Sequence, residues 1–150
     1  MLAPVYDASR RQVVFTSMDA KVHAVRVDDG VPLFSYETGG GIYASACIEA
    51  DTVFVASLDK VIYAIDLKNG TLRWKFLTTG RIFASPALAD GSLWIGSNDG
   101  VLYELDPDSG KRRSLFQASE RIVTRVAYDE ATRRIYVGTV ANEIYCLQRE

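Results

Sequence analysis

One pattern of residues returns every forty positions along this chain, and it constrains the fold more than any other feature. The clearest series are Gly30, Gly70 and Gly110; Ser17, Ser57 and Ser97; Asp19, Asp59 and Asp99; and Ile42, Ile82 and Ile122. A fourth copy follows with two residues inserted in its first hairpin. Self-similarity of this kind predicts a repeat architecture in which each unit packs on its neighbours.

The stretch 61–76 shows what one unit contains. Its sequence, VIYAIDLKNGTLRWKF, places two runs of β-branched and aromatic residues around a polar turn that closes on Asn69-Gly70. Asn and Gly tolerate the positive φ that a tight hairpin turn can require. Alternation with a period of two directs Leu72, Trp74 and Phe76 to one face. We therefore predict an antiparallel hairpin here.

Every copy can be divided into short strands in this way, and no segment has helical periodicity. The predicted strands are 2–6, 13–17, 22–27 and 31–37; 42–48, 53–57, 61–66 and 71–76; 82–88, 92–97, 101–106 and 112–117; and 122–128, 134–139 and 143–147. Four-stranded antiparallel units at a period near forty predict an all-β fold, the β-propeller. We expect one domain over 1–150, with blades at 2–40, 41–80, 81–120 and 121–150, the last without its outermost strand.

The segment AIDLKNGTLRW resembles the tryptophan-docking motif of the pyrroloquinoline-quinone (PQQ)-like propeller family. Ala64, Asp66, Gly70 and Trp74 match that motif in order, and residues 85–110 resemble the rest of the repeat. The resemblance covers nearly the whole chain. It implies a β-propeller that is often periplasmic or extracytoplasmic.

The same resemblance implies that Trp74 packs between Ala64 of its own blade and the peptide at Gly110 of the next blade. Other copies depart from the motif: Phe34 and Ser114 replace the Trp, Arg26 replaces the Asp, and Glu104 replaces the Ala. Docking at the first and third blades is therefore expected to be weaker.

Quinoprotein dehydrogenases with this fold hold PQQ and an ion such as Ca²⁺ over a complete ring of blades, often beside a pair of adjacent cysteines. Here Cys47 and Cys146 lie far apart in sequence, and about half of the usual blades are present. We expect two buried free thiols, no cofactor, no bound metal and no catalytic residue. The alternative is a C-terminal fragment of a PQQ-dependent quinoprotein oxidoreductase.

Other polar motifs have structural interpretations. His23, the one histidine, takes the position of Tyr63 and Tyr103 and is expected to fill a packing slot. The run 39–41, three glycines, joins strand to strand without the helix and Lys of a phosphate loop, which favours a blade crossover. The repeated aspartates lie in tight turns, where they are expected to cap backbone N–H groups.

Composition narrows the classes of partner. A formal net charge of −2 gives no strong attraction to nucleic acid, and no apolar run approaches the length of a membrane span. The first residues lack the basic start and apolar core of a signal peptide. We expect a protein partner, no nucleic acid and no direct membrane insertion, and the sequence assigns no compartment.

Candidate partner-binding residues lie on the loops at the mouth of the ring, because rigid blades leave those loops free to vary. They are Tyr43, Arg81, Phe83, Arg121 and Arg125 from the crossovers, with Asp59, Lys60 and Asn98 from the turns between second and third strands. The expected function is a non-catalytic scaffold that binds a protein or another ligand through this mouth.

The fourth copy stops after its third strand, which leaves three arrangements open. Two half-rings could pair into an eight-bladed ring, four blades could close alone, or the chain could be a fragment of a longer seven- or eight-bladed propeller. Exposed blade faces and an unpaired strand edge favour pairing or a missing half over a four-bladed ring.

Overall fold

The computed structural model describes residues 3–148 and contains β-strands and no helix within that range. The first blade consists of β1 (Val5–Asp7), β2 (Gln12–Thr16), β3 (Lys21–Arg26) and β4 (Pro32–Glu37). The second consists of β5 (Cys47–Glu49), β6 (Thr52–Ala56), β7 (Val61–Asp66) and β8 (Leu72–Leu77). The third consists of β9 (Ala87–Ala89), β10 (Ser92–Gly96), β11 (Val101–Leu105) and β12 (Arg112–Gln117). The fourth consists of β13 (Ala127–Asp129), β14 (Arg134–Gly138) and β15 (Ile144–Gln148).

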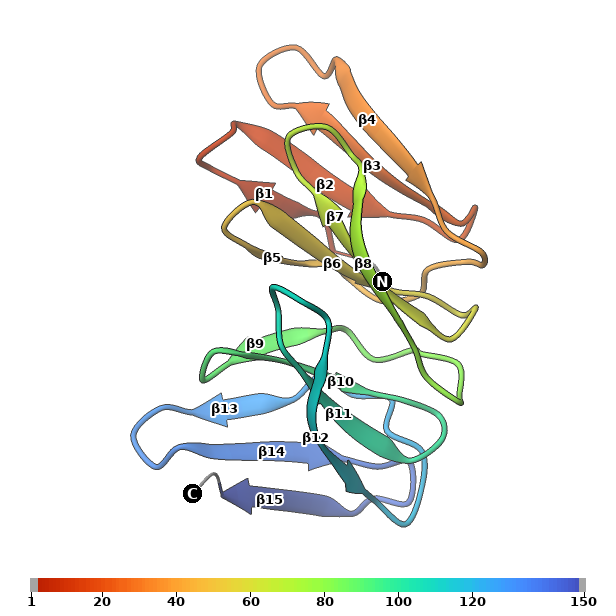
Figure 1. Ribbon diagram of the computed structural model, residues 1–150, viewed down its shortest axis with the longest axis vertical. Coiled ribbons are helices and arrows are strands. Elements are labelled where there is room, and N and C mark those ends of the chain that lie inside the picture. Colours follow the sequence, from red (N-terminus) through yellow and green to blue (C-terminus); the bar gives the residue numbers. More distant parts are fainter. Residues whose placement is uncertain (1–2, 149–150) are drawn as a thin grey trace.

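Each sheet is an antiparallel meander whose strands pair in sequence order. The four sheets follow one another along an open arc, with the first and last blades at opposite ends (Figure 1). The all-β, four-unit prediction is therefore confirmed. The arc is a fragment of a ring, so a closed ring of four blades does not form.

The first strand of each blade is shorter than predicted. We expected strands over 42–48, 82–88 and 122–128, but pairing begins only at Cys47, Ala87 and Ala127. The isoleucines that suggested strands are buried in the crossovers, and the Ile42 N–H donates to the Ser17 carbonyl at 3.1 Å. A turn of the preceding blade thus satisfies a backbone group that a ladder would otherwise satisfy. In the first blade, Leu2 of the expected strand lies outside the described residues.

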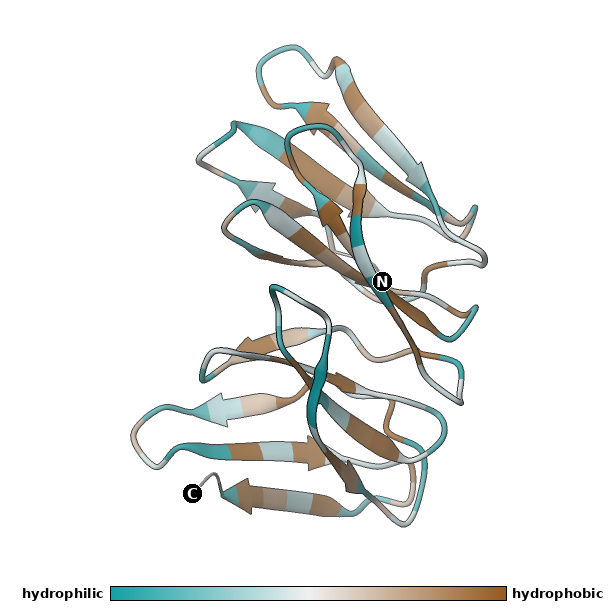
Figure 2. Ribbon diagram, in the orientation of Figure 1, coloured by the Kyte–Doolittle hydropathy of each residue, from teal (hydrophilic) through white to brown (hydrophobic). Residues whose placement is uncertain are grey.

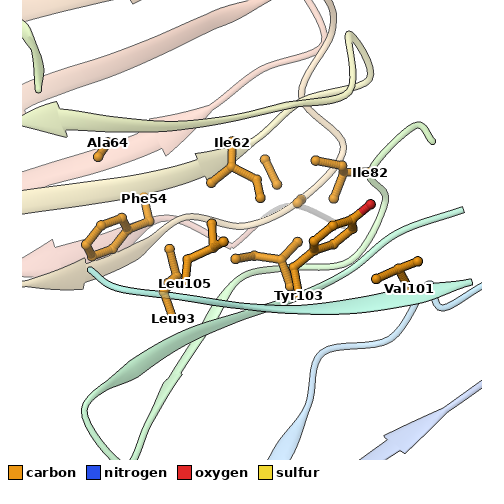
Figure 3. Packing of buried hydrophobic residues seen from close by; sticks show 11 residues of the cluster. Phe54, Ile62, Ala64, Ile82, Leu93, Val101, Tyr103 and Leu105 are labelled. Atoms are coloured by element: carbon orange, nitrogen blue, oxygen red, sulfur yellow. The ribbon is translucent and has the colours of Figure 1, made fainter. Parts of the chain in front are cut away.

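The core consists of three seams, each between two consecutive blades. In the middle seam, Phe54 and Ile62 of the second blade point toward Leu93, Tyr103 and Leu105 of the third (Figure 3). Hydrophobic residues concentrate in the strands, while the hairpin turns are hydrophilic (Figure 2). Since every blade packs on its neighbours alone, the seams hold the arc together.

Burial differs between middle and terminal blades. All residues of β6 and of β10 are buried, because a blade covers each face of these two sheets. In β2 of the first blade, buried residues alternate with partly exposed ones, and β14 of the fourth blade alternates in a similar way. Each terminal blade therefore has one face that no described residue covers.

None of residues 3–148 forms a helix with the length and hydropathy of a membrane span.

Candidate partner-binding site at the mouth

The crossovers and the turns between second and third strands come together at one end of the blades. The Leu58 N–H donates to the Gly41 carbonyl at 2.9 Å, and the Asn98 N–H donates to the Arg81 carbonyl at 3.0 Å. Val140 and Arg121 make the same contact in the next unit at 3.1 Å. The structure thus brings the crossover and turn candidates to one surface, which we call the mouth.

Asp59 and Asp99 each make two kinds of contact, of which the sequence predicted one. As expected, the Oδ1 atoms of Asp59 and Asp99 accept the N–H two residues further on, both at 2.9 Å. The other oxygen reaches the preceding crossover: Asp59 Oδ2 accepts the Gly39 N–H at 2.9 Å. Asp99 Oδ2 likewise accepts the Gly80 N–H at 3.1 Å. Each aspartate therefore joins its own blade to the loop before it.

A tyrosine completes each of these contacts. Tyr63 donates its hydroxyl hydrogen to Asp59, and Tyr103 donates to Asp99 at 2.8 Å. Burial and the hydrogen bond to the carboxylate raise the pKa of Tyr63 to about 12. We call this carboxylate–tyrosine pair with its crossover N–H the blade clamp. Alignment of tyrosines at a forty-residue spacing was the sequence signal for it, but spacing gave no sign of the backbone partner.

Two aromatic rings lie together at the mouth. The rings of Tyr43 and Phe83 meet edge to face, with centroids 5.6 Å apart. Tyr43 remains 55% exposed, whereas Phe83 is half-buried. An exposed ring held by a second ring offers a large contact area that loses little conformational freedom on binding.

The mouth also carries exposed cations. Arg81, Arg121 and Arg125 are exposed, and no carboxylate among residues 3–148 lies within ion-pair distance of their guanidinium groups. Lys60 is also exposed and occupies a turn with φ of 75°. The mouth therefore presents unneutralised positive groups beside an aromatic surface.

Asn98 has a different place from the other candidates. Its side chain is partly buried, and Asn98 Oδ1 is a buried acceptor for which residues 3–148 supply no donor. An unsatisfied buried acceptor costs about 1–3 kcal/mol. A donor from water or from a partner at the mouth would remove this cost.

A ladder of hydrogen bonds between small residues just before the first strands of the blades was not predicted from the sequence. The Ala3 N–H donates to Ser45 Oγ at 2.9 Å, and the Ser45 N–H donates to Ser85 Oγ at 3.0 Å. Arg125 holds the corresponding position in the fourth copy. Ser45 and Ser85 lie forty residues apart, but their hydrogen bonds run between blades and not within one.

Trp74 makes contacts across the seam between the second and third blades. Trp74 pairs with Ala64 in the sheet, and its indole N–H donates to the Pro107 carbonyl at 2.9 Å. A Cβ added at Gly110 would come within 2.6 Å of the indole ring, so the ring lies directly on that glycine. Phe34 lies on Gly70 in the same way. The Gly70 N–H donates to the backbone carbonyl of Asp66 and not to its side chain. The carboxylate of Asp66 accepts a hydrogen bond from Arg73, which lowers the pKa of Asp66.

The third blade replaces the apolar docking pair with polar groups. Glu104 is 5% exposed and accepts hydrogen bonds from Ser92, at 2.7 Å, and from Ser114. Arg113 donates to Ser92 Oγ at 2.7 Å. The buried carboxylate thus has hydrogen-bond donors on both oxygens, as a buried charge requires.

A polar depression of about 420 Å³ lies at the opposite end of the blades, between the second and third units. Its two arginines are already engaged, Arg73 with Asp66 and Arg113 with Asp106, each at 2.6 Å. The depression is therefore lined by internal ion pairs, whereas the guanidinium groups at the mouth are available.

The expectation of two buried thiols is wrong for one cysteine. Cys47 is partly buried, and burial raises the pKa of its thiol, but Cys146 is exposed. Cys146 lies in β15 on the uncovered face of the fourth blade. Within residues 3–148, no three His, Cys, Asp or Glu side chains are placed to hold a metal ion together.

Known proteins share the blade architecture of this chain. A family profile, PQQ_2, described as outer membrane protein assembly factor BamB, matches residues 3–150. The chain belongs to this PQQ-like propeller family. No curated protein matches the sequence.

Solved structures agree on the fold. The chain is similar to BamB from Moraxella catarrhalis, with 20% identity and a TM-score of 0.86 over 97% of this chain and 45% of that one. It is similar to the quinohemoprotein alcohol dehydrogenase ADHIIG from Pseudomonas putida HK5, with 17% identity and a TM-score of 0.79 over 90% and 27%. The WD40 β-propeller domain of Doa1 gives 14% identity and a TM-score of 0.83 over 97% and 49%.

These identities are low enough that the likeness shows the fold alone. The chain spans less than half the length of these three similar structures. Both an assembly factor and an oxidoreductase share its blades.

Proposed function

We propose that this chain is a non-catalytic binding module whose mouth takes a protein partner. The observation that carries the proposal is the contact of the exposed Tyr43 ring with Phe83, at a mouth that also carries the exposed Arg81, Arg121 and Arg125. Aromatic residues and arginine are enriched in protein interfaces and dominate their energetic hot spots. Membership of the BamB-like family supports a protein partner, since a BamB is an assembly factor.

The chemistry of the donors argues against the alternative, a fragment of a quinoprotein oxidoreductase. PQQ carries carboxylates and is held with a metal ion, which needs oxygen ligands that converge on one point. The mouth offers arginines for the carboxylates, but the described residues assemble no group of metal ligands. The residues present therefore do not fit PQQ with its ion.

Site-specific photo-crosslinking tests the proposed surface. A photoreactive amino acid at Tyr43 is expected to capture a discrete partner, and Arg81→Glu in the same chain is expected to abolish the capture. Leu72 is the control, because it is 39% exposed but lies at the start of β8, beside the hairpin turn at the end of the blades opposite the mouth. Equal capture at Leu72 and Tyr43 would refute binding through the mouth.

Titration with PQQ and Ca²⁺ tests the alternative separately. A scaffold is expected to show no saturable change in the unfolding midpoint. A saturable increase would mean that the folded chain binds the quinone, and the non-catalytic proposal would then fail.

A further inference from the structure

The uncovered face of the first blade carries the same three kinds of contact site with which the second and third blades bind the preceding blade. We call it the leading face; its residues include Phe15, His23, Val25 and Leu33, from β2, β3 and β4. The equivalent faces of the second and third blades are covered by the preceding blade. The three kinds of contact at those covered faces define what the leading face lacks.

The first contact site is a glycine that no side chain covers. Phe34 covers Gly70 and Trp74 covers Gly110, each from the outermost strand of the preceding blade. Gly30 is the equivalent residue of the first blade, with the same positive φ of 70°, yet a Cβ built there meets no atom within 4 Å. Gly30 therefore lacks the aromatic ring that its two counterparts have.

The second contact site is an incomplete blade clamp. In the second and third blades, the carboxylate and tyrosine hold a backbone N–H of the preceding crossover. The first blade has Asp19 and His23 in these positions, with Asp19 Oδ2 and His23 Nε2 3.7 Å apart. The Asp19 side chain is 55% exposed, and no crossover N–H among residues 3–148 reaches it. This pair is arranged like the others but holds no loop.

The third contact site is an apolar surface. The rings of Phe15 and His23 stack with centroids 5.0 Å apart and planes 24° from parallel. Together with Val25 and Leu33 they line an open depression of about 320 Å³. The corresponding Val55, Tyr63 and Ile65 of the second blade are buried in a seam. Leaving such a face in water is unfavourable by the hydrophobic effect.

We propose that the leading face of the first blade holds a further complete propeller blade from outside this chain, which carries an aromatic residue on its outermost strand. That ring lies on Gly30, and the crossover that follows the strand donates a backbone N–H to Asp19. The proposal extends two interfaces that the structure already contains, and it involves a surface distinct from the mouth.

Pairing of two copies into one ring is the competing arrangement, and the fourth blade fits it poorly. Within residues 3–148 the fourth blade has three strands, so it presents neither an outermost strand with an aromatic residue nor a following crossover. Its uncovered face instead presents Ile144, which is 78% exposed, and Cys146. Residues 3–148 of a second copy therefore supply, through this blade, neither a ring for Gly30 nor a crossover N–H for Asp19.

The test adds such a blade to the intact chain. Ala3 and Ser45 hold equivalent places in the row of hydrogen bonds that precedes the first strands of the blades. A copy of residues 45–84 fused directly before Ala3 therefore continues the repeat in register. The copy brings its own equivalents of Trp74 and Gly80. The unfolding midpoint of the fusion is expected to exceed that of the parent chain by about 5 °C or more.

Matched variants show whether the gain comes from the leading face. Asp19→Ala and Val25→Asp are expected to lower the midpoint of the fusion by several degrees more than that of the parent. Trp74→Ala in the added copy alone is expected to remove much of the gain. An unchanged midpoint, aggregation of the fusion, or equal effects of Val25→Asp in both backgrounds would overturn the proposal.

The mass of the parent chain provides a measurement that does not depend on the fusion. Light scattering is expected to give a monomer. A stable dimer that Val25→Asp converts to a monomer would identify a second copy as the occupant of the leading face and would also overturn the proposal.

Discussion

The seam between the second and third blades allows a quantitative test of docking by Trp74. Replacing Trp74 with Ala removes a half-buried indole that contacts Phe54, with centroids 5.7 Å apart, and donates to Pro107. Loss of a Trp side chain from a core costs about 3–5 kcal/mol, and partial exposure places this site at the lower end. Trp74→Ala is therefore expected to lower the free energy of unfolding by about 3 kcal/mol.

Gly110→Ala tests the same contact from the other side. The new Cβ would lie 2.5 Å from Trp74 Cε3, and the backbone φ is 69°. The positive φ costs about 1 kcal/mol for an L-residue, and overpacking against the ring adds about 2 kcal/mol. Gly30→Ala is the matched control, since its φ is 70° and the added Cβ meets nothing. It is expected to cost about 1 kcal/mol only.

The double variant separates docking from backbone strain. When Trp74 is already Ala, the space above Gly110 is empty, so Gly110→Ala should cost only its strain. The two substitutions should then show a coupling of about 2 kcal/mol in a double-mutant cycle. Urea unfolding followed by far-ultraviolet circular dichroism measures all four proteins. Equal costs at Gly110 and Gly30, or additive costs in the cycle, would refute docking of the indole on Gly110.

Three further predictions concern other parts of the chain. Ala20 has a φ of 69° in the turn between β2 and β3, so Ala20→Gly should raise the unfolding midpoint by about 2 °C, and a fall in that midpoint would contradict the strain argument. Burial raises the pKa of Asp7, but hydrogen bonds from Ser9, Arg10 and Gln12 outweigh that effect and lower the pKa from 3.8 to about 2. The ionised Asp7 therefore contributes about 2 kcal/mol above pH 4, which is lost as the pH falls toward 2. In urea titrations at several pH values, Asp7→Asn should be less stable at pH 7 and should lose less stability on acidification; parallel acid profiles would refute this. Cys146 is exposed, whereas burial raises the pKa of the Cys47 thiol, so a thiol reagent should label Cys146 first, and Cys146→Ser should abolish the fast phase; equal rates would contradict the assignment.

The sequence predicted the fold correctly because the repeat is visible in many residues at once. Fifteen strands were expected, and residues 3–148 form fifteen, with turns at the predicted places. The errors lie at the first strand of each blade, where Ile42 and its counterparts looked like strand residues. These isoleucines are buried, but apolar character alone does not distinguish a strand from a buried crossover.

The mouth was less predictable than the fold. Tyr43, Arg81 and Phe83 were placed on crossovers from the repeat, and the structure brings these crossovers together with the turns. The second task of Asp59 could not be predicted, because a carboxylate that caps its own turn gives no sign of its other oxygen. Exposure of Cys146 depends on which blade faces are covered, and that is a property of the assembly and not of a local pattern.

The blade clamp has a consequence for how such surfaces can diversify. Asp59 and Asp99 hold the crossovers through the main-chain N–H groups of Gly39 and Gly80. A Cβ at Gly39 would lie 2.7 Å from Asp59 Oδ2, and one at Gly80 would lie 2.4 Å from the Asp99 backbone N, so the clamp requires these two glycines. It involves no side chain of the exposed residues that follow them, such as Tyr43 and Arg81. Mutations can change the chemistry of the mouth while its shape persists, so new recognition can evolve on an unaltered framework, one loop at a time.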